Sequence, residues 1–246
     1  MQARQRPMAS ALRFYGMILK FQSGVAARSN RIMDPKLPLR AQIDVAEAAS
    51  GMPALLSLAA EHGTDLLREA AEHWMSPGER KWRQSLESAM NSDLAPSAGA
   101  DDFFSRACLQ PLAENLQLQQ PEGSYTGGDR CPACGGLPQM AVLRPEGDAA
   151  GRWLLCCFCL REWAFRRLIC PWCRKEDKEK LPRFSSDDWP SVHIEACDTC
   201  RHYLKAIDMT VDGLAVPLVD EAAFSVLDVW ANDRGYQKIV PNLLGF

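Results

Sequence analysis

Apolar residues in the first 120 positions recur at intervals of three and four, the spacing of one buried face of an α-helix. One such run extends from Leu55 to Trp74, and Gly63 marks a break within it. A further helix is predicted to start at Ser76 as N-cap, with Pro77 in the first helical position and Glu79 three residues after the cap. The pattern therefore predicts an all-helical N-terminal region.

A stretch rich in Ser, Ala, Pro and Gly, Ser92–Ala100, separates these helices from a third helical pattern. We expect Asp101 or Asp102 to cap this third helix and Pro111 to kink or restart it. Cys108 falls on its apolar face, where a cysteine behaves as a small buried hydrophobe.

Short apolar runs replace the helical pattern between Arg130 and Gly213 and predict the strands of small metal-binding ribbons. The stretches around Pro145–Gly151 and Lys175–Asp188 are predicted as loops between them. The predicted strands are Gln139–Leu143, Trp153–Leu155, Trp163–Leu168 and Tyr203–Thr210.

The last thirty residues predict one helix and a tail. Val219–Asn232 has an apolar face at helical spacing, Asp220 is its expected cap, and Gly235 lies beyond its end. The tail Ile239–Phe246 is apolar and is expected to pack against the body of the protein.

Four Cys-x-x-Cys pairs, each of which we call a knuckle, lie within seventy residues of the predicted ribbons. A knuckle directs two sulfurs at one ion, and two knuckles complete a tetrahedron. Eight thiolates therefore predict two mononuclear sites. The expected ligands are Cys131, Cys134, Cys156, Cys159, Cys170, Cys173, Cys197 and Cys200.

The spacing favours pairing the knuckles in sequence order. That order leaves 21 residues between the first two knuckles and 23 between the last two, close to ribbon spacing, whereas interleaved pairing needs 35 and 37. The register of the second knuckle leaves Cys157 as a spare thiol. Four thiolates suit Zn²⁺ and a single iron equally well, so the spacing does not distinguish them.

The sequence contains no recognisable catalytic arrangement. We find no nucleophile–base pair and no phosphate-binding loop, and a site filled by four protein sulfurs keeps no open position for metal-assisted hydrolysis. The four histidines are not needed as ligands. A non-enzymatic protein is therefore expected.

Composition and charge bear on the possible partners and on the cellular compartment. The formal net charge of −3 gives no reason to expect binding to polyanions, and no apolar stretch approaches the roughly 20 residues that cross a bilayer. No secretory signal is evident, and paired cysteines hold metals in a reducing compartment, so a cytoplasmic protein is expected. The first 33 residues are basic and contain no acidic residue. We expect a helical start or a frayed tail there, in preference to an organelle-targeting peptide or a nucleic-acid arm.

The knuckles and their surroundings resemble the formate dehydrogenase accessory protein family, FdhE. The likeness extends over about 102–246 and is loose before that. It rests on Phe103–Glu114 (FFSRACLQPLAE), Cys131–Pro138 (CPACGGLP), Leu155–Trp163 (LCCFCLREW), Arg167–Cys173 (RLICPWC), Glu195–Lys205 (EACDTCRHYLK), Val216–Glu221 (VPLVDE), Leu227–Trp230 (LDVW), Gly235-Tyr236 and Pro241–Leu244 (PNLL).

The resemblance implies a multi-domain α+β protein: an N-terminal all-α helical domain (1–122), two tandem rubredoxin-like, zinc-ribbon-like metal modules (127–168 and 169–215), and a C-terminal helix with the apolar tail (216–246). It implies a cytoplasmic, non-catalytic maturation factor that binds the immature catalytic subunit of formate dehydrogenase. It also favours iron over zinc as the occupant of the two four-cysteine sites, with no nucleic-acid partner and no membrane insertion.

Two other functions remain open on the sequence. A zinc-ribbon nucleic-acid binder would use Arg161, Arg166, Arg167, Arg174 and Lys175 to bind phosphates and Trp163 or Trp172 to stack on bases, although neighbouring acidic residues weaken this hypothesis. A rubredoxin-like electron carrier would have the same metal chemistry.

Overall fold

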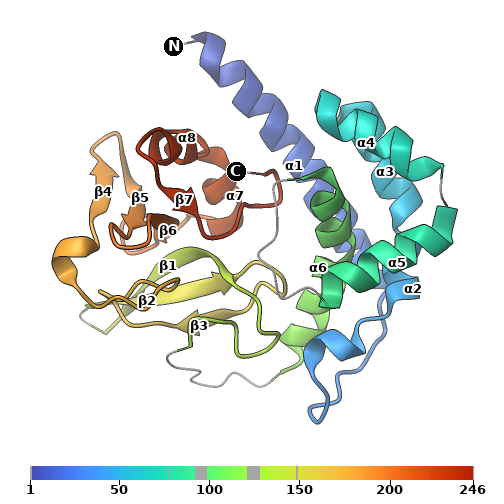
Figure 1. Ribbon diagram of the computed structural model, residues 1–246, viewed down its shortest axis with the longest axis horizontal. Helices are drawn as coiled ribbons and strands as arrows, with labels where there is room; N and C mark the ends of the chain where they lie inside the picture. The colour runs from blue at the N-terminus through green and yellow to red at the C-terminus, as the bar shows by residue number, and fades with distance from the viewer. Residues whose placement is uncertain (1, 77, 92–98, 121–127, 148, 246) are drawn as a thin grey trace. The chain divides into compact units, whose positions relative to one another are not determined.

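The computed structural model describes residues 2–76, 78–91, 99–120, 128–147 and 149–245 (Figure 1). The chain forms two compact units, Met1–Pro121 together with Leu243–Gly245, and Glu122–Asn242. The architecture is α+β, as predicted: a helical unit is followed by a sheet unit that carries two groups of four cysteines and ends in helices.

The helical unit is organised around its last helix. This helix, α6, has 12 of its 19 residues buried, because α1 to α5 all contact it and leave little of its surface to solvent. The elements of the unit are α1 (Gln2–Arg28), the 3₁₀ turn η1 (Leu39–Gln42), α2 (Val45–Ser50), α3 (Met52–His62), α4 (Asp65–Met75), α5 (Gly78–Asn91) and α6 (Ala100–Leu118).

Several predicted helix boundaries in this unit are wrong. Ser76 is the C-cap of α4 and not the N-cap of the next helix, and Pro77 lies outside the described residues. Gly99 is the N-cap of α6, while the Asp101 carboxylate accepts a hydrogen bond from the Trp74 indole instead (2.6 Å). For Asp101, a tertiary hydrogen bond thus engages a side chain that the local sequence suits to capping.

Helix α6 also continues through Pro111. A proline inside a helix removes one hydrogen bond and costs about 3 kcal/mol, and for this reason the sequence predicts a kink or restart. The surrounding side chains are buried on both sides of Pro111, and burial of this size offsets the local cost. The break at Gly63 between α3 and α4 is present, with Thr64 capping α4.

The second unit contains one sheet with strand order β3-β2-β1-β6-β5-β4, and β7 also pairs with β6. The β1–β6 and β6–β7 pairs are parallel and the others are antiparallel. The strands are β1 (Pro138–Glu146), β2 (Ala149–Cys156), β3 (Glu162–Ala164), β4 (Arg183–Ser186), β5 (Trp189–Ala196), β6 (His202–Asp208) and β7 (Gln237–Lys238).

The two predicted loops of this unit are partly strand. Residues around Pro145–Gly151 continue the β1–β2 hairpin, and the later part of Lys175–Asp188 contains β4, preceded by the 3₁₀ turn η2 (Lys178–Lys180). Strand β5 is absent from the predicted strands. Its buried Val192, Ile194 and Ala196 alternate along the strand, a period of two that the sequence does carry.

Two short helices, α7 (Pro217–Ala223) and α8 (Val226–Asp233), cover one face of the sheet. The prediction of one helix capped by Asp220 is wrong, because the chain turns at Phe224–Ser225 and Val216 is the N-cap. The Asp220 carboxylate instead accepts a hydrogen bond from the Val216 N–H (2.7 Å). The apolar core under these helices comprises Met140, Val142, Leu155, Val192, Ile194, Tyr203 and Ile207 from the strands and Ala231 from α8.

The apolar tail is divided between the units. Ile239 and Val240 are buried with the sheet unit, Leu243–Gly245 belongs to the helical unit, and Phe246 lies outside the described residues. None of the described helices is long and apolar enough to cross a bilayer. The predicted division of the sheet unit into two metal modules and a C-terminal segment, at 168/169 and 215/216, stays a prediction. The paired strands β1 and β6 belong to different proposed modules and join them in one sheet.

Candidate metal centres

The structure gathers the eight knuckle cysteines into two groups of four, and within each group the four sulfurs lie within 4.8 Å of one another. Site 1 contains Cys131, Cys134, Cys156 and Cys159, and site 2 contains Cys170, Cys173, Cys197 and Cys200. The grouping follows sequence order, so each knuckle meets its neighbour along the chain.

Strand pairing explains the grouping. Antiparallel pairing of β1 with β2 sets Pro138 opposite Cys156, which brings the first knuckle to the second. The fourth knuckle is the turn between β5 and β6. Because β1 and β6 are parallel and each begins just after a knuckle, both sites lie at the same end of the sheet.

All four knuckles share one backbone turn. In each, the N–H of the first cysteine donates to the carbonyl five residues later at 2.8–3.0 Å. The residue after the second cysteine has a left-handed backbone in every case. These residues are Gly135 (φ 73°), Leu160 (57°), Arg174 (63°) and Arg201 (61°).

Among these four residues, only Gly135 is of a type that adopts positive φ without strain. Leu160, Arg174 and Arg201 hold the same conformation at a cost of order 1–3 kcal/mol each. The turn directs N–H groups toward sulfur: the Phe158 N–H donates to the Cys156 sulfur at 3.3 Å. The repeated cost indicates that the turn serves the sulfur sites.

The sulfur spacing fits a single tetrahedral ion. Metal–sulfur bonds of about 2.3 Å place the corners of a regular tetrahedron about 3.8 Å apart. The Cys170–Cys200 and Cys173–Cys197 sulfurs of site 2 are each 3.7 Å apart, and the corresponding pairs of site 1 are 3.5 and 3.4 Å apart. Each group of four cysteines, as thiolates, therefore fits one Zn²⁺ or one iron ion.

The two sites differ in exposure. Three of the four cysteines of site 1 are buried, whereas Cys173 of site 2 is exposed and Cys200 is half-buried. Trp172, in the third knuckle, is 40% exposed and stacks on His202 at 4.4 Å between ring centroids. Site 2 is therefore the more accessible centre.

Glycine is required beside site 1. A Cβ atom on Gly136 would lie 2.8 Å from the Cys156 sulfur and 3.3 Å from the Cys134 sulfur. The close approach of backbone to sulfur leaves no space for a side chain at this position.

The remaining thiols and the histidines lie outside both groups. Cys157 is buried within the second knuckle, and Cys108 is completely buried in α6, where burial raises the pKa of its thiol to about 12. In the part of the chain that the structure describes, no histidine joins either sulfur group. His193 is completely buried in β5 and its Nε2 lies 3.5 Å from the Glu195 carboxylate.

Sequence reasoning missed a buried charge cluster on the helix-covered face of the sheet. Lys205 of β6 and Lys238 of β7 meet Glu221 of α7 and Asp228 of α8, and all four are at most 8% exposed. The Tyr203 hydroxyl donates to Asp228 at 2.8 Å, which caps the cluster. Two positive and two negative groups balance one another, the arrangement that buried charge requires.

The cluster sets the protonation of the Glu221 carboxylate. Burial by itself raises the pKa of Glu221, but the charges of Lys238 and Lys205 outweigh burial and lower that pKa to about 2. Lys205 was the available signal, since it is a lysine in the middle of an apolar strand. The cluster ties both C-terminal helices to the sheet that holds the sulfur sites.

Fold and sites together define a class: a helical unit followed by a sheet unit, in which one sheet carries two four-cysteine groups that could each hold a metal ion. The FdhE central-domain profile matches residues 130–167, and the FdhE C-terminal-domain profile matches residues 169–244. The chain is 30% identical over 200 residues to the protein FdhE homolog of Aquifex aeolicus, which covers 78% of this chain and 68% of the relative. The chain belongs to the FdhE family.

A second relative and a solved structure are also similar to this chain. The protein FdhE homolog of Pseudomonas aeruginosa is 32% identical over 204 residues, covering 79% of this chain and 63% of the relative. The chain thus spans about two thirds of the length of these relatives. The crystal structure of the FdhE protein from Pseudomonas aeruginosa has the same fold, with a TM-score of 0.71 at 22% identity over 97% of this chain and 94% of that one.

Proposed function

We propose that the protein is a cytoplasmic maturation factor for formate dehydrogenase, which binds the immature catalytic subunit and has no catalytic activity of its own. The proposal rests on one observation above the others: the sheet unit of an FdhE-family chain carries two sulfur groups of matching design. In this proposal the eight knuckle cysteines each ligate one of two mononuclear ions, with iron favoured and zinc the alternative.

The chemistry of the sites supports a structural or redox role for the ions. Four thiolates saturate a tetrahedral ion and keep no position open for substrate. The protein's residues hold the ions through strained knuckle turns, and the ions fix two hairpins at one end of the sheet. Client binding then uses the scaffold that the ions stabilise.

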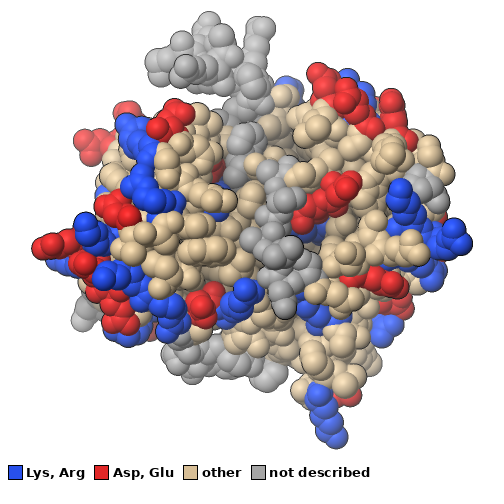
Figure 2. All heavy atoms as spheres, viewed as in Figure 1, with Lys and Arg blue, Asp and Glu red and all other residues tan. Residues whose placement is uncertain are grey.

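The nucleic-acid alternative finds little support in the placement of the basic residues. Arg161 is buried, and Arg166 pairs with Glu176 at 3.3 Å. Of the two candidate tryptophans, Trp163 is only 1% exposed and is not available to stack on a base, whereas Trp172 is 40% exposed and already stacks on His202. Figure 2 shows acidic and basic side chains interspersed over the sheet unit on the face in view, without the single-sign field that phosphate binding favours.

The test is complementation of a deletion strain. We expect wild type and Cys108→Ser to restore formate-dependent dye reduction, and Cys159→Ser or Cys173→Ser to fail while the client polypeptide is still synthesised. Tagged wild-type protein should recover the catalytic subunit in a pull-down. Full dye reduction in the deletion strain, with no client recovered, would show the maturation proposal to be wrong, and reversible reduction of the purified protein at physiological potential without a client would favour the electron carrier.

A further inference from the structure

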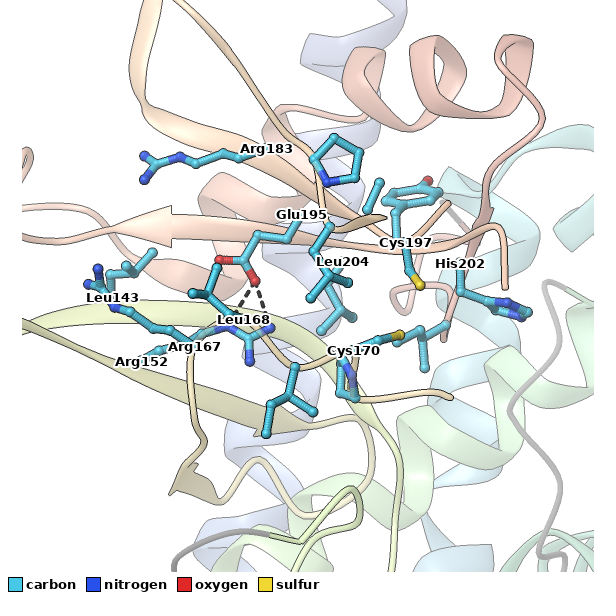
Figure 3. Close-up of a pocket in the computed structure, with 17 residues that line it drawn as sticks. Leu143, Arg152, Arg167, Leu168, Cys170, Arg183, Glu195, Cys197, His202 and Leu204 are labelled. Atoms are coloured by element: carbon cyan, nitrogen blue, oxygen red, sulfur yellow. Dashed lines mark hydrogen bonds and ion pairs between the residues drawn. The ribbon is translucent and has the colours of Figure 1, made fainter. Parts of the chain in front are cut away.

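The sheet unit contains a pocket of about 180 Å³ beside site 2 (Figure 3). Its floor is the face of the sheet that α7 and α8 do not cover. One side is formed by the crossover, residues 167–169 between β3 and the third knuckle, and the other by residues 181–183 at the start of β4. Cys170 and Cys197 border one end. The volume equals that of about six water molecules, which suits a small molecule with a handful of heavy atoms.

The pocket has an excess of positive charge. Its lining carries three guanidinium groups, from Arg152, Arg167 and Arg183, and one carboxylate, from Glu195. Arg152 is buried and donates from both Nε (2.8 Å) and Nη2 (2.6 Å) to one oxygen of Glu195, so these two charges offset each other. Figure 3 shows this pair with Arg183 on the β4 side of Glu195, and with the Arg167 and Arg152 side chains overlapping in the view.

The two remaining arginines are only weakly neutralised. Arg167 donates to the Ala150 carbonyl at 2.6 Å, and no carboxylate of the described residues lies within 4 Å of its guanidinium. Arg183 is half exposed, and its closest carboxylate, on Asp208, is 3.7 Å away, beyond hydrogen-bond distance. An anion between these arginines would gain charge-assisted hydrogen bonds from planar, permanently charged donors.

Apolar walls complete the pocket. Leu143 and Leu204 project from the sheet, and Leu168 and Ile169 from the crossover. Leu168 has a left-handed backbone (φ 58°), which is costly for leucine, and its side chain is 55% exposed. A ligand with a short apolar body and one anionic group matches both the walls and the charges.

We propose that this pocket binds a small organic anion, a carboxylate or phosphate with a short apolar body, held by Arg167 and Arg183. The pocket is too small for a folded segment of a protein partner. This assignment is independent of the client and of the identity of the metal.

Binding is tested on the full chain by NMR or calorimetric titration with butyrate, with inorganic phosphate as a competitor and butanol as an uncharged analogue. We expect saturable millimolar binding of butyrate, displacement by phosphate, and at least tenfold weaker binding of butanol. Arg167→Gln and Arg183→Gln should each weaken butyrate about tenfold, and Arg167→Lys should weaken it less because it retains the charge.

The matched control is Arg166→Gln, which removes the same charge one residue away, from a side chain that pairs with Glu176 outside the pocket lining. Butyrate affinity in that variant should stay within about twofold of wild type. The proposal is overturned by a linear titration up to about 50 mM, by equal weakening in the Arg166 and Arg167 variants, or by an acidic peptide that saturates the pocket when butyrate does not. Unchanged circular dichroism of the variants separates lost binding from lost folding.

Discussion

Replacing Lys205 by methionine tests whether the buried charge cluster holds the sheet unit together. Methionine fills a similar volume but removes the ammonium group, whose Nζ lies 2.6 Å from the Asp228 carboxylate and 3.1 Å from the Glu221 carboxylate. The variant would leave one lysine facing two carboxylates, so the cluster would carry one uncompensated buried negative charge.

The two contacts set the size of the effect. At an effective dielectric constant of about 20, they amount to roughly 6 and 5 kcal/mol of gross attraction. Desolvation of the ammonium group and repulsion from Lys238 oppose this attraction, and the net cost of breaking a buried pair is about 3–5 kcal/mol. We therefore expect Lys205→Met to destabilise the sheet unit by about that amount.

Native-state hydrogen exchange measures this cost locally, which matters because a two-unit protein need not unfold in one step. Amides of β6 and α8 should exchange about two to four powers of ten faster, while amides of α6 in the helical unit serve as the internal control. The double variant Lys205→Met with Asp228→Asn should recover about 1–3 kcal/mol, since it restores charge balance. A loss below about 1 kcal/mol in the single variant would mean that the cluster does not hold the sheet unit together.

Three further outcomes follow from the sites. A chelator should remove one of the two bound ions much faster than the other, because Cys173 leaves site 2 more exposed than site 1. Cys173→Ser should lower the metal content from two ions per chain to one, whereas Cys157→Ser should leave it at two, because Cys157 belongs to neither group. Gly136→Ala should reduce occupancy of site 1, measured as metal per chain, because its Cβ would collide with the Cys156 sulfur. The pKa of Glu221 is about 2 in the folded protein and ordinarily 4.5, so its contribution to folding stability is complete above about pH 4.5 and is lost as the pH falls toward 2. Glu221→Gln should therefore flatten the dependence of thermal stability on pH in that range.

The sulfur groups were predictable because their chemistry is local. A Cys-x-x-Cys turn specifies its own geometry, and the spacing of 21 and 23 residues accommodates one hairpin between each pair of knuckles. The structure groups the sulfurs in sequence order, as this spacing predicts. What the sequence did not reveal was that Leu160, Arg174 and Arg201 adopt the strained turn, since they are not residue types that favour positive φ.

Helix boundaries were less predictable because capping signals compete with tertiary contacts. Ser76 and Asp101 have the side chains of N-caps, yet one ends α4 and the other accepts a hydrogen bond from Trp74. Pro111 has the local chemistry of a helix break, yet α6 is surrounded by other helices and continues. For Asp101 and Pro111, contacts distant in sequence decide the outcome.

The buried charge cluster was hidden for a related reason. Glu221 and Asp228 are seven residues apart, so the sequence places them on one face of the predicted helix, and acidic side chains are rarely buried unless they are paired. Their burial depends on Lys205 and Lys238, which arrive from β6 and β7. The sequence offered Lys205 as a signal of a buried charge, but its partners become recognisable only when the sheet pairing and the positions of the two helices are known.

The parallel β1–β6 pair links the two metal centres physically. β1 begins after the first knuckle and β6 after the fourth, and their register sets Ala141 beside Ala206 and Leu143 beside Asp208. Parallel pairing between strands about 65 residues apart carries a large loop-closure cost, and an ion bound at each four-cysteine group would close part of that loop at the same end of the sheet. Lys205 then secures β6 against α7 and α8. The sulfur sites and the charge cluster therefore stabilise the same strand through different contacts, in a sheet whose two hairpins have no local reason to meet.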